Sequence, residues 1–359
     1  MTRVAVLGAG AGGLSATVEL TQAGHQVALW NRNAQTLEAN AAGGVLRFDG
    51  VLGTGSVTPY AVTGDLAAAV GDAEAVVVCL PSIAHGRLFE DLAQLRITTP
   101  VVLNPGHTGA VLEARRIWEQ AGVTLPPFVE LSTLTYVARI NEGVVRTTGR
   151  AGTVRVAGLP GAAAAVTFAC QLFPGVQPVA DVLASSLANV NLVLHPPGAV
   201  LALAWTEATG GNYTFYREAM TAGVASVLTA LDGERLAVAS AFGHELLPLV
   251  QEMVEIGTVD PKHARAGDVA AAIRGGVANQ SITGPDSTTH RYYREDFPYG
   301  LQPFVALADV VGLAVPVARS LLAIAATVLG REIMQAGRTA EALGIAGMSE
   351  STLLDIVRG

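Results

Sequence analysis

The first half of the chain alternates short, uninterrupted runs of apolar residues with segments of helical length. Continuous apolar runs of this kind are typical of parallel strands that are buried on both faces of a sheet. The pattern predicts strands at 4–7, 25–30, 75–80, 101–103, 128–137, 143–148 and 153–157, with helices at 14–23, 110–121 and 162–173. Strands and helices that alternate in this way predict a doubly wound α/β sheet of the Rossmann type.

The pattern changes beyond Pro178, where apolar positions recur at helical spacing over long segments. These segments predict helices at 184–194, 199–208, 215–242, 301–311 and 317–334. The length of 359 residues suits two domains. We therefore predict an α/β domain at 1–180 and a mainly α-helical domain at 181–359. The longest predicted loop, 275–289, is of a size that is often functional in compact enzymes.

The turn after the first strand carries three spaced glycines, Gly8, Gly10 and Gly13. A strand-to-helix turn without Cβ atoms lets a pyrophosphate approach the backbone at the positive end of the helix dipole. The strand before this turn and the strand after the helix supply the context that the motif requires. The glycines therefore predict dinucleotide binding by the first domain. Pro81 and Ser82, at the end of a later buried strand, are expected to line the same crevice.

The second strand ends in Trp30-Asn31-Arg32, where a site that reads an unphosphorylated ribose usually has an acidic residue. An arginine at this point can instead pair with a 2′-phosphate through charge-assisted hydrogen bonds. Asn31 and Arg32 therefore favour NADP(H), while NAD(H) stays open, and the alternative for Arg32 is a solvated surface side chain.

Composition excludes several classes of protein. An apolar content of 50% with 14% charged residues predicts a large buried core, and the net charge of −8 argues against nucleic acid as a partner. The most apolar stretch, 311–330, contains Pro316 and Arg319, which favours a buried helix over a membrane span. Cys79 and Cys170 are too isolated for a disulfide framework, and no His, Cys, Asp or Glu spacing suits a metal. No signal peptide precedes the first strand, so we expect a cytoplasmic protein.

One of the seven histidines lies in an unusual setting. His195 follows a small or apolar helical segment, and Asn191 precedes it by one turn on the same face. Pro196 and Pro197 are expected to end this helix. A polar pair on an apolar helix indicates either a catalytic group or a core histidine that Asn191 satisfies.

Four elements of the sequence resemble the opine dehydrogenase family, which includes octopine dehydrogenase and N-(1-D-carboxyethyl)-L-norvaline dehydrogenase. They are Asn104-Pro105-Gly106-x-Thr108-Gly109, Ser186-Leu187-x-Asn189-Val190-Asn191-x-Val193-x-His195-Pro196, Arg291-Tyr292-x-x-Glu295-Asp296-x-x-x-Gly300-Leu301 and Gly337-Arg338-Thr339-x-x-x-Leu343-Gly344. They occur in order over essentially the whole chain, and the Asn-x-x-x-His-Pro element is the most specific. The resemblance implies a Rossmann domain followed by a helical substrate and catalytic domain.

The resemblance also implies an activity. An L-amino acid and a 2-keto acid, typically pyruvate, would condense, and nicotinamide hydride would reduce the imine to a secondary amine dicarboxylate. The catalytic residues it implies are His195, Asp296 and Asn191. An imidazole suits proton transfer near neutral pH, and a carboxylate would fix its tautomer. Without the resemblance, Asp296 would be interpreted as a helix cap or surface carboxylate.

Both proposed substrates carry carboxylates, so arginine side chains are expected at the site. We predict Arg291 first and Arg139 second, and Thr108 as a further contact to substrate. The side-chain pocket is expected in the helical domain, around Trp205, Tyr213, Phe215 and Tyr216, all of which also suit a core. The partners are small molecules rather than a membrane, and a homodimer is compatible with the sequence, which does not define the oligomeric state.

Two other functions compete with this interpretation. Reductases of the ketopantoate reductase and glycerol-3-phosphate dehydrogenase type share the glycine turn, but they rely on a lysine in the helical domain. The only lysine of this chain, Lys262, follows Pro261 in a predicted loop. A non-catalytic nicotinamide-sensing protein would have no use for the combination of Asn191, His195 and Asp296.

Overall fold

The computed structural model describes residues 1–264, 267–276 and 280–359. The chain forms two compact units, one of residues 1–106 and 117–178, the other of residues 107–116 and 179–359. The main division lies two residues from the predicted one, but the prediction was wrong for residues 107–116. This segment clusters with the second unit because buried contacts hold it there: Glu113 accepts a hydrogen bond from Arg338 at 2.7 Å, and Gly109 N–H donates to Ser186 at 2.9 Å.

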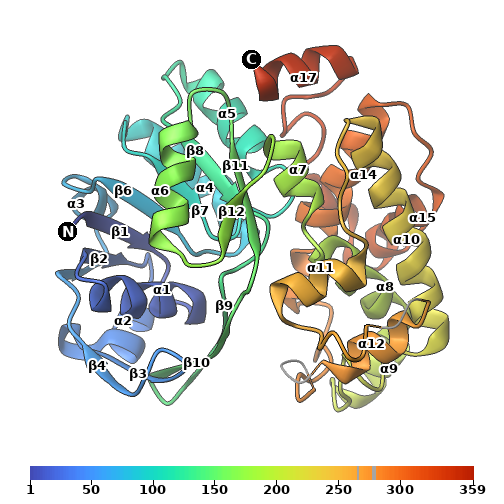
Figure 1. The fold of residues 1–359 in the computed structure, drawn as a ribbon, viewed down its shortest axis with the longest axis horizontal. Helices are drawn as coiled ribbons and strands as arrows, with labels where there is room; N and C mark the ends of the chain where they lie inside the picture. Colours follow the sequence, from blue (N-terminus) through green and yellow to red (C-terminus); the bar gives the residue numbers. More distant parts are fainter. Residues whose placement is uncertain (265–266, 277–279) are drawn as a thin grey trace. The chain divides into compact units, whose positions relative to one another are not determined.

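The first unit is built on an eight-stranded sheet in the order β12-β11-β8-β7-β6-β1-β2-β5 (Figure 1). Its strands are β1 (Arg3–Leu7), β2 (Gln26–Trp30), β5 (Ala61–Thr63), β6 (Ala75–Val78), β7 (Val101–Leu103), β8 (Phe128–Leu131), β11 (Val154–Gly158) and β12 (Val176–Pro178). Neighbours from β5 to β8 are parallel, and β11 is antiparallel to β8. The central strands are fully buried, as their continuous apolar runs predict. The predicted doubly wound sheet is confirmed.

Helices connect the strands of this sheet. They are α1 (Ala11–Gln22), α2 (Ala34–Ala41), α3 (Leu66–Val70), α4 (His85–Gln94), α5 (Ala110–Ala121) and α6 (Ala163–Leu172), with short 3₁₀ turns η1 (Ala42–Gly44) and η2 (Ser82–Ala84). Strand order reverses on either side of β1, so the carboxyl ends of β1 and β6 flank the topological switch point at which dinucleotides bind in such sheets.

A second, four-stranded sheet has the order β4-β3-β10-β9. Its strands are β3 (Leu46–Gly50), β4 (Gly55–Val57), β9 (Tyr136–Asn141) and β10 (Val144–Arg150). The single strand predicted at 128–137 is therefore wrong, because it divides into β8 of the large sheet and β9 of the small one. The break lies where Thr135 hydrogen-bonds twice to the Asn104 side chain, at 2.9 and 3.1 Å, a long-range contact that apolar periodicity does not reveal.

The second unit is helical. Its helices are α7 (Val182–Leu187), α8 (Asn191–Leu201), α9 (Leu203–Thr209), α10 (Ala222–Ala241), α11 (Leu249–Ile256), α12 (Val269–Gly275), α13 (Arg291–Arg294), α14 (Gln302–Val310), α15 (Pro316–Leu329), α16 (Arg331–Gln335) and α17 (Glu350–Arg358), with a π-helical turn η4 (Phe297–Leu301). The mainly helical character predicted for this half of the chain is confirmed.

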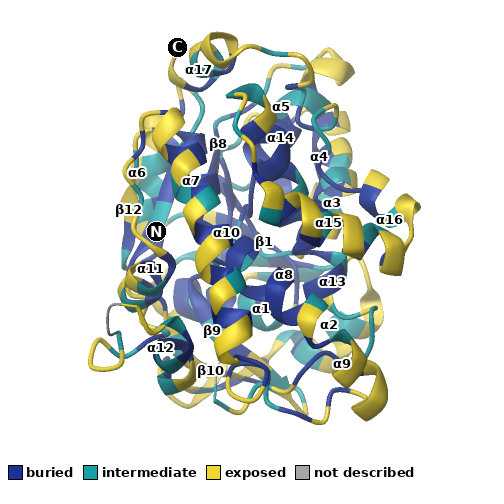
Figure 2. Ribbon diagram, turned by 90° about the vertical axis from the view of Figure 1, so that its right-hand side faces the viewer, coloured by how far each residue is buried: buried dark blue, intermediate teal, exposed yellow. Residues whose placement is uncertain are grey.

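Of the predicted helix boundaries in this unit that are wrong, two have a clear physical cause. Pro196 and Pro197 do not end the helix but lie inside α8, whose residues from Leu192 to Ala199 are almost all buried (Figure 2). Packing of this apolar helix outweighs the two backbone hydrogen bonds that the prolines cannot donate. The helix predicted at 215–242 begins only at Ala222, because Thr221 caps α10 by accepting a hydrogen bond from Val224 N–H at 3.3 Å.

Part of the predicted loop at 275–289 lies outside the described residues, at 277–279. Gly275 ends α12, and Thr283 forms a β-bridge with Thr214. Among the described residues, no single helix is both long and apolar enough to cross a membrane. One bent succession, from Val182 to Leu201 and from Leu203 to Thr209, meets the length and composition requirement with a bend of 64°.

Candidate active site

The glycine turn of the first unit leaves bare backbone at the amino end of α1. Gly8 has φ +122°, and a Cβ there would lie 2.5 Å from the Cys79 carbonyl oxygen. A Cβ on Gly13 would lie 1.8 Å from the Gly8 carbonyl oxygen. Gly10 is the N-cap of α1 with no side-chain hydrogen bond to the helix, and a Cβ there would meet nothing within 4 Å. The first N–H groups of α1 are thus accessible to an anion, which fits the pyrophosphate of a dinucleotide.

The carboxyl end of β2 connects to this turn through Asn31. Its Oδ1 accepts a hydrogen bond from Ala9 N–H at 3.3 Å, and its Nδ2 donates to the Asn33 carbonyl at 3.2 Å. Arg32 is exposed beside it, and its guanidinium forms no hydrogen bond or ion pair with another described residue. Arg32 is therefore available to a ligand.

Pro81 and Ser82 follow β6 at the neighbouring strand end. Pro81 is exposed and is the N-cap residue of η2, whereas Ser82 is buried. His85 begins α4 and is buried, with its Nε2 3.1 Å from the Leu80 carbonyl oxygen. His85 and His107 both follow strand ends, and the His85 ring is hydrogen-bonded to a backbone carbonyl.

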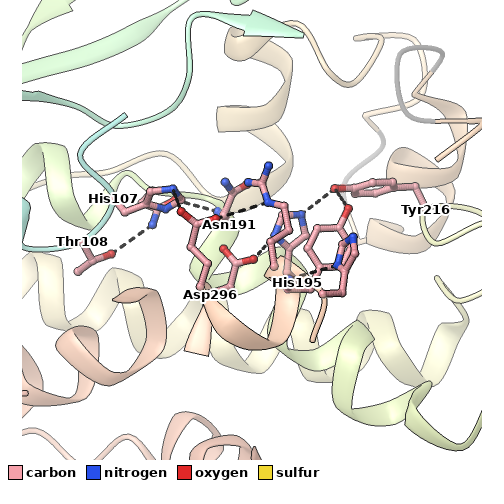
Figure 3. Close-up of polar contacts among 11 residues, drawn as sticks. His107, Thr108, Asn191, His195, Tyr216 and Asp296 are labelled. Carbon is pink, nitrogen blue, oxygen red and sulfur yellow. Dashed lines mark hydrogen bonds and ion pairs between the residues drawn. The ribbon is translucent and has the colours of Figure 1, made fainter. Parts of the chain in front are cut away.

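His195 and Asp296 meet in the second unit, although 101 residues separate them in sequence (Figure 3). His195 Nδ1 lies 2.8 Å from Asp296 Oδ2, and both side chains are buried. Asp296 is held by the π-helical turn that follows it, in which Leu301 N–H donates to the Asp296 carbonyl at 2.8 Å. A carboxylate accepts, so Nδ1 carries the proton and Nε2 of the neutral ring is an acceptor.

Aromatic side chains enclose the His195 ring. Tyr216 Oη lies 2.7 Å from His195 Nε2, and Tyr292 stacks on the imidazole with ring centroids 3.9 Å apart. Tyr216 Oη is also 3.3 Å from Tyr292 Oη. Burial raises the pKa of Tyr216 well above its usual value of 10, and the neighbouring Tyr292 adds to this shift. Tyr216 is therefore a neutral phenol at physiological pH.

A second histidine–carboxylate pair lies next to the first in sequence. Glu295, the residue before Asp296, has Oε1 3.3 Å from His107 Nε2, and both side chains are buried. Its other oxygen, Oε2, is 3.5 Å from Arg291 Nε. Burial alone would lower the pKa of Arg291, but Glu295 and Asp296 raise it. The Arg291 side chain is 55% exposed, so its charge faces solvent beside the buried pair.

Hydrogen bonds connect the segment at 107–109 to the start of α8. The Thr108 hydroxyl donates to the Ser186 carbonyl and accepts from Asn189 Nδ2, each at 3.3 Å. Asn189 Oδ1 in turn accepts from Asn191 N–H at 3.1 Å, which positions the first turn of α8. Thr108 is fully buried, so these contacts account for its hydroxyl, and its predicted substrate contact stays a prediction.

The remaining predicted residues lie elsewhere. Arg139 is exposed on β9 of the first unit and donates to the Ala138 carbonyl. Lys262 lies in a turn rather than on a helix. Trp205 stacks on Tyr213 with ring centroids 4.4 Å apart, which is a packing role. No group of three or more His, Cys, Asp or Glu side chains in the described part of the chain could hold a metal ion.

Sequence reasoning missed the roles of His107, Glu295 and Tyr292 and placed Tyr216 only in a side-chain pocket. Glu295 and Tyr292 lie inside a matched family element, so their position offered a signal. His107 offered only its place after a strand. Tyr216 lay within a segment that was expected to be helical, and nothing in its neighbours indicates a contact with His195.

Two family sequence models match the chain. The model described as NAD/NADP octopine/nopaline dehydrogenase, alpha-helical domain, matches residues 178–329. The model described as ketopantoate reductase PanE/ApbA matches residues 4–104. An opine dehydrogenase from Arthrobacter sp. (strain 1C) is 29% identical over 357 residues, which cover 98% of each chain.

Solved structures with the same fold include two dehydrogenases. Octopine dehydrogenase with NADH and L-arginine has a TM-score of 0.78 at 19% identity, over 99% of this chain and 98% of that one. The same enzyme with NADH and pyruvate has a TM-score of 0.77 at 20% identity, with the same coverage. Yersinopine dehydrogenase with bound NADP+ has a TM-score of 0.75 at 17% identity, over 100% of this chain and 98% of that one.

Proposed function

The chain belongs to the opine dehydrogenase family of NAD(P)-dependent oxidoreductases that act on CH–NH bonds, and we propose that it joins an L-amino acid to a 2-keto acid by reductive condensation. The observation that carries this proposal is the buried His195–Asp296 pair, with Nδ1 and Oδ2 2.8 Å apart. Pyruvate is the keto acid that we infer, because the related octopine dehydrogenase has been solved with it. The product is a secondary amine dicarboxylate, and the reverse reaction returns the two substrates.

The chemistry needs a group that moves protons near neutral pH. The amine adds to the keto carbon to form a carbinolamine, which loses water to form an imine. Each step moves a proton on or off nitrogen or oxygen, and an imidazole suits both directions. Asp296 keeps the proton on Nδ1 and stabilises the imidazolium ion, so proton exchange occurs at Nε2. Asn191 precedes His195 by one turn of α8, and we propose that it contacts substrate.

The cofactor is a nicotinamide dinucleotide, which supplies hydride when bound. The residues that would hold it are Gly8, Gly10 and Gly13 through bare backbone, with Pro81 and Ser82 at the neighbouring strand end. We propose a preference for NADP(H), because Asn31 is a neutral amide that is already bonded to backbone and Arg32 is exposed beside it.

Substrate carboxylates need cationic partners, and Arg291 is the one that the contacts favour. It is half-exposed, and its charge lowers the pKa of Tyr216 against the larger effect of burial. We propose that Arg291 binds the carboxylate of the keto acid. Arg139 lies in the first unit and would need to reach the substrate from there.

The ketopantoate reductase match covers the nucleotide-binding half, where all such enzymes share the glycine turn. No lysine is present on the described helices of the second unit, since Lys262 lies in a turn. A simple keto acid reduction is therefore disfavoured.

The function is tested by supplying the purified protein with NADPH and pyruvate and adding a panel of L-amino acids one at a time. We expect NADPH oxidation only when a suitable amino acid is present, with formation of a secondary amine that mass spectrometry detects. Oxidation with pyruvate alone at an equal rate would show a simple reductase. Cofactor binding without turnover across the panel would support the sensing protein.

The cofactor preference is tested by Arg32→Asp. We expect the affinity for NADPH to fall by about 10- to 100-fold, as expected for a lost charge-assisted contact, while the affinity for NADH changes by less than about threefold. Arg3→Asp, at the opposite end of β1, is the matched control and should leave both affinities unchanged. Equal losses for both cofactors with Arg32→Asp would contradict the 2′-phosphate contact.

A further inference from the structure

His195 Nε2, the nitrogen that exchanges protons in the proposed reaction, already has a hydrogen-bond partner. Asp296 takes Nδ1, and the Tyr216 hydroxyl lies 2.7 Å from Nε2. With the neutral ring protonated on Nδ1, the phenol donates to Nε2. When the ring is protonated on both nitrogens, Nε2–H donates to the phenol oxygen instead, and the phenol proton can turn toward another acceptor. The hydroxyl can therefore transmit a proton in either direction.

The imidazole has few other ways to exchange a proton. His195 is 3% exposed, Tyr292 covers one face at 3.9 Å, and Phe215 lies against its edge at 6.0 Å between ring centroids. Both ring nitrogens are engaged, so a reactant would reach Nε2 only by displacing Tyr216 or through its hydroxyl. The phenol is the polar atom that continues the chain beyond Nε2.

Tyr216 is held in place by its own segment. Phe215 N–H donates to the Ile282 carbonyl at 2.9 Å, and the Glu218 carboxylate accepts from both the N–H and the hydroxyl of Thr214, at 2.6 and 2.8 Å. The Tyr216 ring packs edge-on against Phe215 with centroids 5.2 Å apart. These contacts on both sides of Tyr216 oppose a swing of the ring away from His195.

We propose that Tyr216 is a catalytic residue that passes the proton between His195 and the oxygen of the carbinolamine. This proposal rests on the proposed function. In the forward direction the C–O bond of the carbinolamine breaks, and its electron pair stays on oxygen, which takes the Tyr216 proton and leaves as water. The nitrogen lone pair forms the C=N bond. Tyr216 regains a proton from Nε2–H of the imidazolium ion, which returns to neutral imidazole.

Two further observations fit this role. The raised pKa of Tyr216, caused first by burial, keeps the phenol protonated and therefore able to donate. The Arg291 charge opposes this shift, so the guanidinium lies within electrostatic reach of the hydroxyl. Tyr292 Oη, 3.3 Å away, adds to this shift and so also favours the protonated phenol.

The test compares Tyr216→Phe with Tyr293→Phe in the condensation assay with NADPH and pyruvate. Tyr293 is the control because it is also buried, and its hydroxyl also makes a buried hydrogen bond that the substitution removes, to the Ala199 carbonyl of α8 at 2.8 Å. We expect Tyr216→Phe to lower kcat by about 100- to 1,000-fold, the range of a lost general acid. The KM for pyruvate should change by less than about threefold, and Tyr293→Phe should retain kcat within the same factor.

A second variant keeps the Tyr216 hydroxyl and changes its acidity. Replacement of Tyr216 by 3,5-difluorotyrosine keeps the hydroxyl but makes it more acidic, so kcat and its solvent deuterium isotope effect should both change if this proton moves in the rate-limiting step. A kcat for Tyr216→Phe within about threefold of wild type, or an equal loss in Tyr293→Phe, would overturn the relay. Wild-type protein without amino-acid-dependent turnover would instead refute the proposed function.

Discussion

The second unit contains two buried histidine–aspartate pairs with nearly the same nitrogen–oxygen distance and nearly the same burial. His195 Nδ1 lies 2.8 Å from Asp296, and His244 Nε2 lies 2.9 Å from Asp181. Both carboxylates are fully buried, and both imidazoles are nearly so. The pairs differ in what their remaining atoms contact, and we propose that this difference separates a catalytic pair from a structural one.

In the structural pair, every carboxylate oxygen has a partner. Asp181 Oδ1 accepts from Leu183 and Ala184 N–H at 3.0 and 3.2 Å, which caps α7, and Oδ2 accepts from Arg358 Nε at 2.7 Å. Arg358 also donates to the Phe242 carbonyl at 2.6 Å. The cluster thereby joins the C-terminal helix α17 to the start of α7. Because its charges are compensated and its acceptors are used, it stabilises the unit and offers nothing to a substrate.

In the His195–Asp296 pair, the second carboxylate oxygen and the second ring nitrogen have different surroundings from those in the Asp181 cluster. Asp296 Oδ1 is buried without a hydrogen-bond partner among the described residues, which is costly for stability. His195 Nε2, the nitrogen away from Asp296, contacts a phenol, which can both donate and accept. In the other pair a guanidinium, which only donates, lies 3.3 Å from His244 Nε2, the nitrogen that already faces Asp181. A buried histidine–carboxylate pair is therefore not evidence of catalysis by itself. What distinguishes the His195 pair is a phenol on the ring nitrogen that faces away from the carboxylate.

The two pairs should differ most in the effect on kcat when the histidine of each pair is replaced by alanine. His195→Ala should lower kcat by about 1,000-fold or more, because the proton-transfer group is lost, while NADPH affinity stays unchanged. His244→Ala should keep kcat within about threefold of wild type but lower the free energy of unfolding by about 1–3 kcal/mol, since Asp181 loses a buried hydrogen bond. Steady-state kinetics, cofactor titration and urea unfolding measure these effects. Loss of NADPH binding in His195→Ala would show that this histidine is structural too.

A smaller effect is expected when the C-terminal arginine is removed. Arg358→Ala leaves the Asp181 carboxylate with its cap and His244 but without its guanidinium, and we expect a loss of about 0.5–1.5 kcal/mol in unfolding free energy. This loss of unfolding free energy is smaller than the loss expected for a fully buried ion pair, because the Arg358 side chain is 41% exposed. Arg331→Ala, an exposed arginine on α16, is the control and should change stability by less than about 0.5 kcal/mol. A large loss of kcat in Arg358→Ala at a temperature where it is folded would contradict a purely structural cluster.

The smallest effect concerns pH. Burial alone would raise the pKa of Asp181, but its hydrogen bonds to His244 and Arg358 outweigh burial and lower it. A carboxyl with a lowered pKa in the folded state stabilises the fold above its unfolded-state pKa of about 3.9, and this contribution is lost as pH falls through the folded value. The difference in unfolding free energy between wild type and Asp181→Asn should therefore be constant above about pH 5 and shrink below about pH 4.

The control for this measurement is Asp49→Asn on the small sheet. The pKa of Asp49 is also lowered, mainly by its hydrogen bond to Arg146, but the pair lies at the surface and contributes little. Urea unfolding of both variants between pH 3 and 7 separates the two cases. A difference for Asp181→Asn that stays constant down to pH 3 would mean that its carboxylate does not stabilise the fold as an ion.

Much of the first unit could be predicted because its requirements are local. The glycines of the first turn follow from the close approach of backbone atoms, and the buried strands follow from continuous apolar runs. The errors there arose where a long-range contact interrupted a local pattern. Asn104 divides an apolar run into β8 and β9, and periodicity carries no signal for this.

The second unit was harder to predict in detail. Its helical character was clear, but Tyr216 was assigned to a helix that starts six residues later, at Ala222. The prolines of α8 were expected to end it, and tertiary packing overrode that preference. His195 and Asp296 were paired in advance only through the resemblance to a family.

The sequence by itself determined the doubly wound sheet, the cofactor turn, the helical second half and the residue types able to move a proton, because each depends on neighbours along the chain. Only the tertiary structure decided which histidine has a phenol on its second nitrogen and which one pairs with a carboxylate that an arginine also compensates. Hydrogen-bond partners 21 and 101 residues away complete the His195 site, and contacts over such separations are selected by packing of the whole unit rather than by local pattern.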